Sequence, residues 1–350
     1  MVKKPIQKKL NTKPKIINLA LQGGGVHASF SWGVLDRLLD EEHLSVEAIC
    51  GTGAGAINAT LLAYGMQTGG RANAKLLLES FWRKVSTLAN LTSLKPSLMD
   101  RFLNNKNLDF SPNFMFLDYI TKLLSPYQYN LFDINPLRDI ITDLIDFENL
   151  RKNCPTKLFI NATNVKTGKI KIFEQHELTL NMLLASSCLP LFYKAVEING
   201  EFYWDGGYSG NPALFPIFYN CQSSDIVIVQ INPFNVEEVP TSAQDIIDRV
   251  NEISFNSTLM REIRSIAFIK KLIDEKKLDS NQYKDILVHL IGSEEIMTSL
   301  GTSSKMNADW EFLTYLRDMG RQAADDWLEK NYDKIGVEPT IDIRKLFLDE

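Results

Sequence analysis

Short apolar runs alternate with segments of helical spacing in the first part of the chain, and glycines stand at the boundaries. Two apolar runs, residues 15–22 and 46–50, predict buried β-strands. Residues 26–42 place apolar side chains three and four positions apart, and the alanine-rich residues 54–64 follow a glycine turn. Both segments are therefore predicted to be helices. The repeated order of strand, glycine turn and helix predicts a parallel sheet with right-handed crossovers.

The later part of the chain continues this mixed pattern. Residues 136–150 have helical spacing, and residues 157–174 alternate as a β-hairpin does, with a Lys-Thr-Gly turn between two apolar runs. Residues 225–233 form an apolar run typical of a buried parallel strand. A last strand is predicted at residues 286–292, within a C-terminal part that is otherwise helical.

We expect an α/β domain over residues 15–240 and a mainly helical C-terminal extension, residues 241–350, packed on it. Residues 88–136 differ from the rest because they are rich in aromatic side chains and interrupted by four prolines. Such a stretch predicts short helices rather than one regular element. Two interpretations stay open: a cap over a channel for acyl chains, or ordinary core packing.

Composition narrows the class of protein. With 350 residues, 45% of them hydrophobic and 23% charged, the chain can bury a large core. The net charge of −5 does not favour binding to nucleic acid. The four cysteines have neither a C-x-x-C pair nor metal-ligand spacing, and no cluster of His, Asp and Glu has such spacing, so no metal is expected.

The N-terminal segment is strongly basic, with six lysines and no acidic residue in the first fifteen positions. We expect residues 1–14 to be a solvated, disordered tail, with a tether to anionic lipid as the alternative. No apolar signal-peptide core follows these lysines, and no apolar run approaches the roughly 20 residues of a membrane span. The expected location is cytoplasmic or peripheral to a membrane, and secretion by a non-Sec route stays open.

The first candidate site is the triple glycine in LQGGGVHASF, residues 21–30. Glycines between a strand and a helix let backbone amides point into a shared cavity, which suits either an oxyanion hole or a phosphate cradle. Gly23, Gly24 and Gly25 are the candidate donors. The spacing Gly23-x-Gly25-x-x-Ala28 also fits the dinucleotide pattern, so an oxidoreductase that binds a dinucleotide is one alternative.

The second candidate site is ICGTGAGAINA, residues 49–59, which has the form of a nucleophile elbow. Small residues at Gly51, Ala54 and Gly55 allow a sharp turn from strand to helix. In G-x-S-x-G hydrolases the apex of this turn is a serine, whereas here it is Gly53. A dinucleotide fold does not need this second glycine turn.

The third candidate site is YWDGGYSGNP, residues 203–212, in which Asp205 ends a predicted strand and Gly206 and Gly207 follow. Its carboxylate can project from the turn toward the same edge of the sheet as the other two sites. The alternative is a turn aspartate that caps its own backbone. Because three glycine-marked sites follow predicted strands, we favour catalysis and expect them to lie within a few ångströms of one another.

These three motifs together resemble the patatin-like phospholipase family. The resemblance runs from about residue 16 to 233, includes the ASSCLP loop at residues 185–190, and extends to residues 304–328. It implies a three-layer α/β/α fold with a mostly parallel central sheet, and residues 15–240 as the acyl hydrolase domain. It also implies hydrolysis of a phospholipid or another fatty acyl ester, as in a phospholipase A or a lysophospholipase, without a cofactor.

Carried over residue by residue, the resemblance implies a Ser–Asp dyad. Position 53 would hold the nucleophile, Asp205 would be the general base, and the glycines at 23–25 would supply oxyanion donors. The sequence departs from the family pattern at His27-Ala28, where members often have Arg-Gly. His27 is a candidate for lining a headgroup pocket, but a histidine without a specific role at the start of the helix is the favoured interpretation. His289 comes after position 53 and Asp205, which is the order of nucleophile, acid and histidine in an α/β-hydrolase triad. However, it lies in an apolar strand, which favours a structural role.

Gly53 is the serious departure, because glycine cannot form an acyl-enzyme. We expect the chain as written to be inactive or nearly so. One explanation is replacement of a serine, by mutation or by design, in an otherwise intact site. The other is a natural pseudoenzyme that binds lipid without cleaving it. The retained Asp205 and glycine loop favour the first. The sequence does not predict the oligomeric state or the headgroup.

Overall fold

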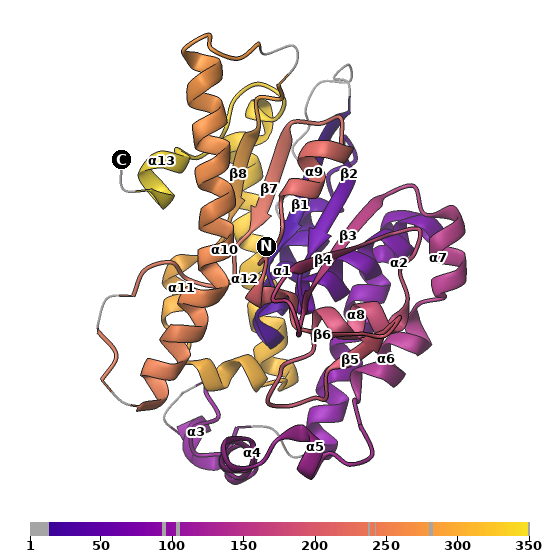
Figure 1. Ribbon diagram of the computed structural model, residues 1–350, viewed down its shortest axis with the longest axis vertical. Helices are drawn as coiled ribbons and strands as arrows, with labels where there is room; N and C mark the ends of the chain where they lie inside the picture. Colours follow the sequence, from indigo (N-terminus) through magenta and orange to yellow (C-terminus); the bar gives the residue numbers. More distant parts are fainter. Residues whose placement is uncertain are drawn as a thin grey trace.

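The computed structural model describes residues 14–92, 96–102, 106–236, 239–241, 243–279 and 283–348. Its centre is a mixed sheet in the strand order β5-β6-β3-β2-β1-β7-β8, with β4 paired to β3 (Figure 1). Neighbours along the path from β3 to β8 are parallel, as the sequence predicts. The parallel strands are β1 (Lys15–Leu21), β2 (Leu44–Gly51), β3 (Lys157–Asn164), β7 (Asp225–Val229) and β8 (Leu287–Ile291).

Three antiparallel strands complete the sheet at the β3 side. They are β4 (Ile170–Glu174), β5 (Val196–Ile198) and β6 (Glu201–Trp204). The β3–β4 pair is the predicted hairpin, and Gly168 in its turn has a positive φ of 67°. At the other edge β8 comes from the C-terminal part of the chain, so residues after 241 contribute a strand to the central sheet as well as helices.

Helices cover both faces of the sheet. One hydrophobic core lies between the sheet and α1 (Ala28–Leu38), α2 (Ala54–Thr92), α8 (Leu180–Ser186) and α12 (Trp310–Asn331). The other lies between the sheet and α9 (Phe215–Asn220), α10 (Ala243–Asp274) and α13 (Ile343–Phe347). Side chains of β1 alternate between them, with Leu19 and Leu21 in the first and Ala20 in the second. This is the predicted three-layer α/β/α arrangement.

The helix that begins at Ala54 continues beyond residue 64, where its predicted range ends, to a kink at Gly69 and Gly70, which have non-helical backbone angles; a second helical stretch runs from there to Thr92. One predicted helix is divided in the structure. Residues 136–150, predicted as one helix, are α6 (Leu137–Leu144) and α7 (Phe147–Asn153). The break occurs because the Asp146 side chain accepts hydrogen bonds from the amides of Glu148 and Asn149 and so starts a new helix.

The aromatic-rich region forms short helices, as predicted: α3 (Leu98–Phe102), α4 (Pro112–Leu123) and α5 (Pro126–Tyr129). Figure 1 shows these three helices together at one end of the molecule, where the start of α10 also lies. Two short elements of the C-terminal part, α11 (Glu294–Thr298) and the 3-10 helix η3 (Thr302–Met306), follow β8. None of the described helices is both long and apolar enough to cross a membrane.

The C-terminal helix α12 packs against α1 so closely that glycine is required at the contact. A β-carbon on Gly320 would overlap the carbonyl of Phe30, and one on Gly33 would overlap the carbonyl of Arg317. We expect Gly320→Ala to lower the unfolding free energy by about 2 kcal/mol or more, because a methyl group there must push two helix backbones apart. Chemical denaturation measures this change.

Gln322→Ala is the matched control, because Gln322 lies on the exposed face of the same helix. It should change stability by less than about 0.5 kcal/mol. Equal stability of Gly320→Ala and Gln322→Ala would contradict the close packing of α12 on α1.

Candidate active site

The turn between β2 and α2 has Gly53 at its apex. Gly53 has a positive φ of 57°, and its amide donates to Ser186 Oγ at 3.0 Å. The preceding Thr52 is fully buried, and its hydroxyl lies 2.6 Å from Asn161 Oδ1 and 2.8 Å from the carbonyl oxygen of Gly210. The Thr52 hydroxyl is therefore held by β3 and the loop after β6, and it does not take the place of the missing serine.

Asp205 lies next to that apex. It follows β6 directly, and its side chain is 7% exposed. Its Oδ1 accepts the Gly207 amide at 2.7 Å, whereas no described residue donates a hydrogen bond to its Oδ2. A β-carbon placed on Gly53 would lie 3.5 Å from Asp205 Oδ2. The structure thus brings position 53 and the Asp205 carboxylate together, although they are 152 positions apart in the sequence.

Burial changes the acidity of this carboxyl. Removal from water disfavours the charged form and raises the pKa of Asp205 to about 7, although the hydrogen bond from Gly207 acts in the opposite direction. Near neutral pH the group therefore exists in both protonation states. A carboxyl with this property can accept and return a proton, which an ordinary surface aspartate does poorly.

The glycine loop lies against the same apex. The β-carbon placed on Gly53 would be 3.6 Å from Gly23 Cα. However, the Gly23 amide already donates to Asn211 Oδ1 at 2.7 Å, so it is not free to bind a ligand. The amides of Gly24 and Gly25 donate to no described residue; Gly24 is half-buried and Gly25 is exposed. Of the three predicted donors, the geometry leaves these two available.

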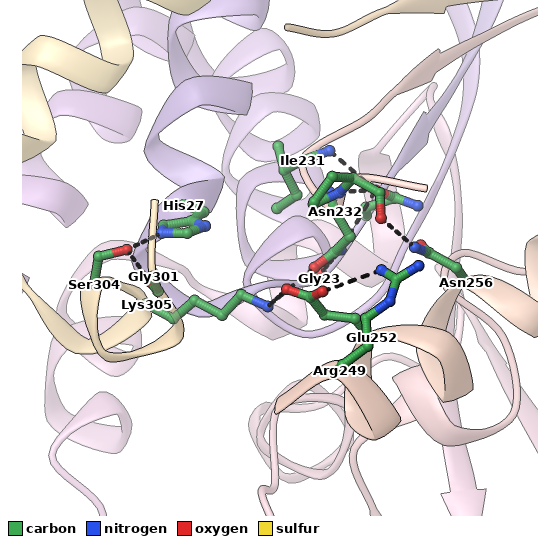
Figure 2. Close-up of polar contacts among 12 residues, drawn as sticks. Gly23, His27, Ile231, Asn232, Arg249, Glu252, Asn256, Gly301, Ser304 and Lys305 are labelled. Carbon is green, nitrogen blue, oxygen red and sulfur yellow. Dashed lines mark hydrogen bonds and ion pairs between the residues drawn. The ribbon is translucent and has the colours of Figure 1, made fainter. Parts of the chain in front are cut away.

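Asparagine and glutamine side chains that none of the three sequence motifs indicated hold the glycine loop in place. Gln22 Oε1 accepts the amides of Ile231 and Asn232, each at 3.0 Å, and Asn232 Nδ2 donates to the Gly23 carbonyl at 2.7 Å (Figure 2). Gln22 and Asn232 each lie at the end of an apolar strand segment. A polar residue at the end of a buried strand was the sequence feature that could have indicated them.

A second asparagine joins the elbow to the Asp205 turn. Asn161 lies in β3, is 1% exposed, and its Nδ2 donates to the carbonyls of Gly206 and Gly210 at 2.9 and 2.8 Å. A β-carbon on Gly206 would overlap the Asn161 carbonyl, so the turn after Asp205 packs directly on β3. This contact fixes the direction in which the carboxylate of Asp205 projects.

His27 does not lie in an open pocket, in contrast to the headgroup role considered from the sequence. Its side chain is 2% exposed, and Nε2 lies 2.7 Å from Ser304 Oγ (Figure 2). Burial, with the nearby charge of Lys305, lowers its pKa to about 3, so the ring is neutral. His27 instead connects the start of α1 to η3, which packs over the glycine loop.

His289 does not belong to the candidate site. It is fully buried in β8, and its Nε2 lies 2.9 Å from Asp225 Oδ1 at the start of β7. Asp225 also accepts the Gly336 amide at 2.7 Å. This pair ties the C-terminal segment to the sheet, which is the structural role that its apolar strand favours. Among the described residues no group of His, Cys, Asp and Glu has the arrangement of a metal site.

Comparison with known proteins supports the resemblance seen in the motifs. The family model described as patatin-like phospholipase matches residues 19–217, which include the glycine loop, the elbow and Asp205. A comparison with curated protein sequences gives no significant match.

Three solved structures are similar at low sequence identity. VipD from Legionella pneumophila is 13% identical with a TM-score of 0.38, and the match covers 96% of this chain and 73% of that one. The type III effector protein ExoU is 15% identical with a TM-score of 0.35, covering 91% and 54%. ExoU in complex with SpcU from Pseudomonas aeruginosa is 12% identical with a TM-score of 0.34, covering 91% and 53%. This chain spans about half the length of ExoU.

The raised pKa of Asp205 should make the unfolding free energy depend on pH. Because the folded-state pKa of about 7 lies above the ordinary value of 3.8, the folded protein binds this proton more tightly than the unfolded chain. The contribution to stability is therefore complete at low pH and decreases as pH rises toward 7. Asp205→Asn removes this titration. As pH rises from acid to mildly alkaline, the unfolding free energy of the variant should therefore increase by up to about 4 kcal/mol relative to that of the parent.

Unfolding free energies from denaturant titrations across this pH range measure the difference. Glu262, whose pKa burial also raises to about 7, is present in both proteins, so its contribution cancels. A difference between the two proteins that does not change with pH would show that Asp205 titrates normally.

Proposed function

Because the chain belongs to the patatin-like phospholipase family, we propose that this site is that of a lipid acyl hydrolase whose nucleophile position is occupied by Gly53. With a serine at position 53, Asp205 would act as the general base. With glycine, the chain is inactive or nearly so, because no hydroxyl is present to attack an ester. The observation that carries the proposal is Asp205 Oδ2, which accepts no hydrogen bond from a described residue and lies 3.5 Å from the place of a β-carbon at position 53.

The proposed reaction uses groups that the site holds. A serine hydroxyl at the apex lies within reach of Asp205 Oδ2, which takes its proton while the oxygen attacks the ester carbonyl. The free amides of Gly24 and Gly25 bind the oxyanion of the tetrahedral intermediate. The alcohol then leaves with the proton from Asp205. Water, deprotonated by the same carboxylate, releases the fatty acid and restores the serine.

The space around the three glycines of the elbow supports the interpretation that glycine has replaced a serine at position 53. A β-carbon on Gly51 would lie 2.9 Å from Ala56 N, and a β-carbon on Gly55 would lie 2.5 Å from the Gln22 carbonyl oxygen. Neither position therefore has room for a side chain. At Gly53 the nearest atoms are at 3.5 Å or more, which is ordinary contact distance. Packing therefore does not require glycine at the apex. Its positive φ costs another residue about 1–2 kcal/mol.

A natural lipid-binding protein without catalysis is the second candidate, and Gly53 itself is the observation that favours it. The dinucleotide alternative rests on the spacing Gly23-x-Gly25-x-x-Ala28 alone. The Gly23 amide, which that alternative needs for a phosphate, is already bonded to Asn211. No other feature of the described residues favours a nucleotide.

We expect Gly53→Ser to increase hydrolysis of fatty acyl esters by at least about a thousandfold over the parent chain, because it supplies the missing nucleophile. The measurement is release of fatty acid from a soluble short-chain ester and from a panel of phospholipids. The control is Gly53→Ala, which makes the same demand on the backbone but has no hydroxyl. Activity of Gly53→Ser no higher than that of Gly53→Ala would refute the hydrolase and favour the lipid-binding protein.

A further inference from the structure

Helix α4 exposes most of its apolar side chains. Only Thr121 is buried among its residues, although a helix of this composition normally packs against a core. Met115, Tyr119 and Leu123 are each about one turn apart and form a ridge along the exposed side. Phe116 beside them is 67% exposed, and Phe132 in the loop after α5 is 88% exposed. Together with Leu131, these side chains define the apolar surface: Met115, Phe116, Tyr119, Leu123, Leu131 and Phe132.

One end of the segment that holds this surface is fixed to the glycine-loop side of the candidate site. Asn307 Nδ2 donates to the Lys106 carbonyl at 2.7 Å, and the Gly301 amide donates to Asn107 Oδ1 at 3.0 Å. The same C-terminal stretch contains Lys305, whose carbonyl would lie 2.5 Å from a β-carbon placed on Gly25. The segment before α4 is thus attached to residues that touch the glycine loop.

The other end is fixed to the Asp205 side. Tyr129 Oη donates to the Leu191 carbonyl at 2.7 Å, and Lys194 Nζ donates to the Leu131 carbonyl at 3.0 Å. The loop that holds Leu191 begins at Cys188, whose carbonyl accepts the Asp205 amide at 2.8 Å. Leu191 is itself exposed, so apolar side chains continue from the apolar surface toward the site. The apolar surface therefore borders the approach to the site and is joined to both of its sides.

We propose that the apolar surface docks this protein on a phospholipid bilayer with the candidate site facing the lipid. The proposal rests on the proposed function, because a lipid hydrolase must meet its substrate where that substrate is embedded. A large exposed apolar patch on a folded domain marks an interaction site, and tyrosine among aliphatic and phenylalanine side chains suits the boundary between water and acyl chains. A second copy of the chain is disfavoured as the partner, because on the apolar surface it would cover the approach to the candidate site.

The charges on α4 favour a bilayer without net charge. Lys122 pairs with Asp118 at 2.7 Å, so this helix has no excess of cations to attract anionic lipid. Attachment by the apolar surface should therefore depend on buried apolar area and only weakly on salt. This distinguishes it from a tether through the basic residues 1–14, most of which lie outside the described residues.

The experiment is co-sedimentation of the chain at low and high salt with vesicles of phosphatidylcholine, alone or mixed with phosphatidylserine, and the oligomeric state of each variant is measured by size-exclusion chromatography. We expect binding at both salt concentrations, and a loss of affinity of about tenfold or more for the double variant Phe116→Glu/Phe132→Glu. Tyr219→Glu is the matched control, because Tyr219 is an equally exposed aromatic residue on α9 and should leave binding unchanged. Unaltered melting temperatures verify that all variants are folded.

Four results would overturn the proposal: no binding to phosphatidylcholine, equal binding of the double variant, binding that requires anionic lipid and disappears in high salt, or a dimer that only the double variant loses. To distinguish failure of this proposal from failure of the proposed function, Gly53→Ser is also introduced into the parent chain and into the double variant. If the surface is right, the triple variant still hydrolyses a soluble short-chain ester but loses hydrolysis of vesicle phospholipid. If vesicle binding holds and Gly53→Ser is inert, only the proposed function fails.

Discussion

The candidate site depends on the carboxyl of Asp205, a residue that is 7% exposed and whose Oδ2 lies beside the apex of a glycine turn, where no described residue donates a hydrogen bond to it. Removing the Asp205 carboxyl from water disfavours its charged form, and this burial raises its pKa. The rest of the site keeps Asp205 in this position. Thr163 donates to its backbone carbonyl, Asn161 holds the turn after it, and the Gly207 amide fixes its other oxygen.

Long-range packing converts three local turns into one site. The parallel strands β1 and β2 end side by side, so the glycine loop and the elbow meet at one edge of the sheet. Asp205 comes from β6, on the far side of β3, and is brought to the same edge because β6 pairs antiparallel with the end of β3. The segment that contains α4 is bonded at one end to the residues after η3, on the glycine-loop side, and at the other end to the loop after Cys188, on the Asp205 side.

The sequence alone could predict the elements that depend on local pattern. The strands, the glycine loop, the elbow and Asp205 all have signals within about ten residues, and the alternation of strands and helices predicts a parallel sheet but not the order of its strands. It could not predict that Asn211 takes the Gly23 amide, because that bond joins residues far apart in the chain. Nor could it predict that Phe116 and Phe132 face solvent, since aromatic residues are more often buried.

The most direct test of the roles of position 53 and Asp205 is reaction with a fluorophosphonate, followed by mass spectrometry of the peptides. We expect an adduct at position 53 in Gly53→Ser, a much slower reaction in Gly53→Ser/Asp205→Asn, and none in the parent chain. Labelling of the parent at another serine near the site, such as Ser186 or Ser209, or an unreactive Gly53→Ser, would contradict the role assigned to position 53 and Asp205.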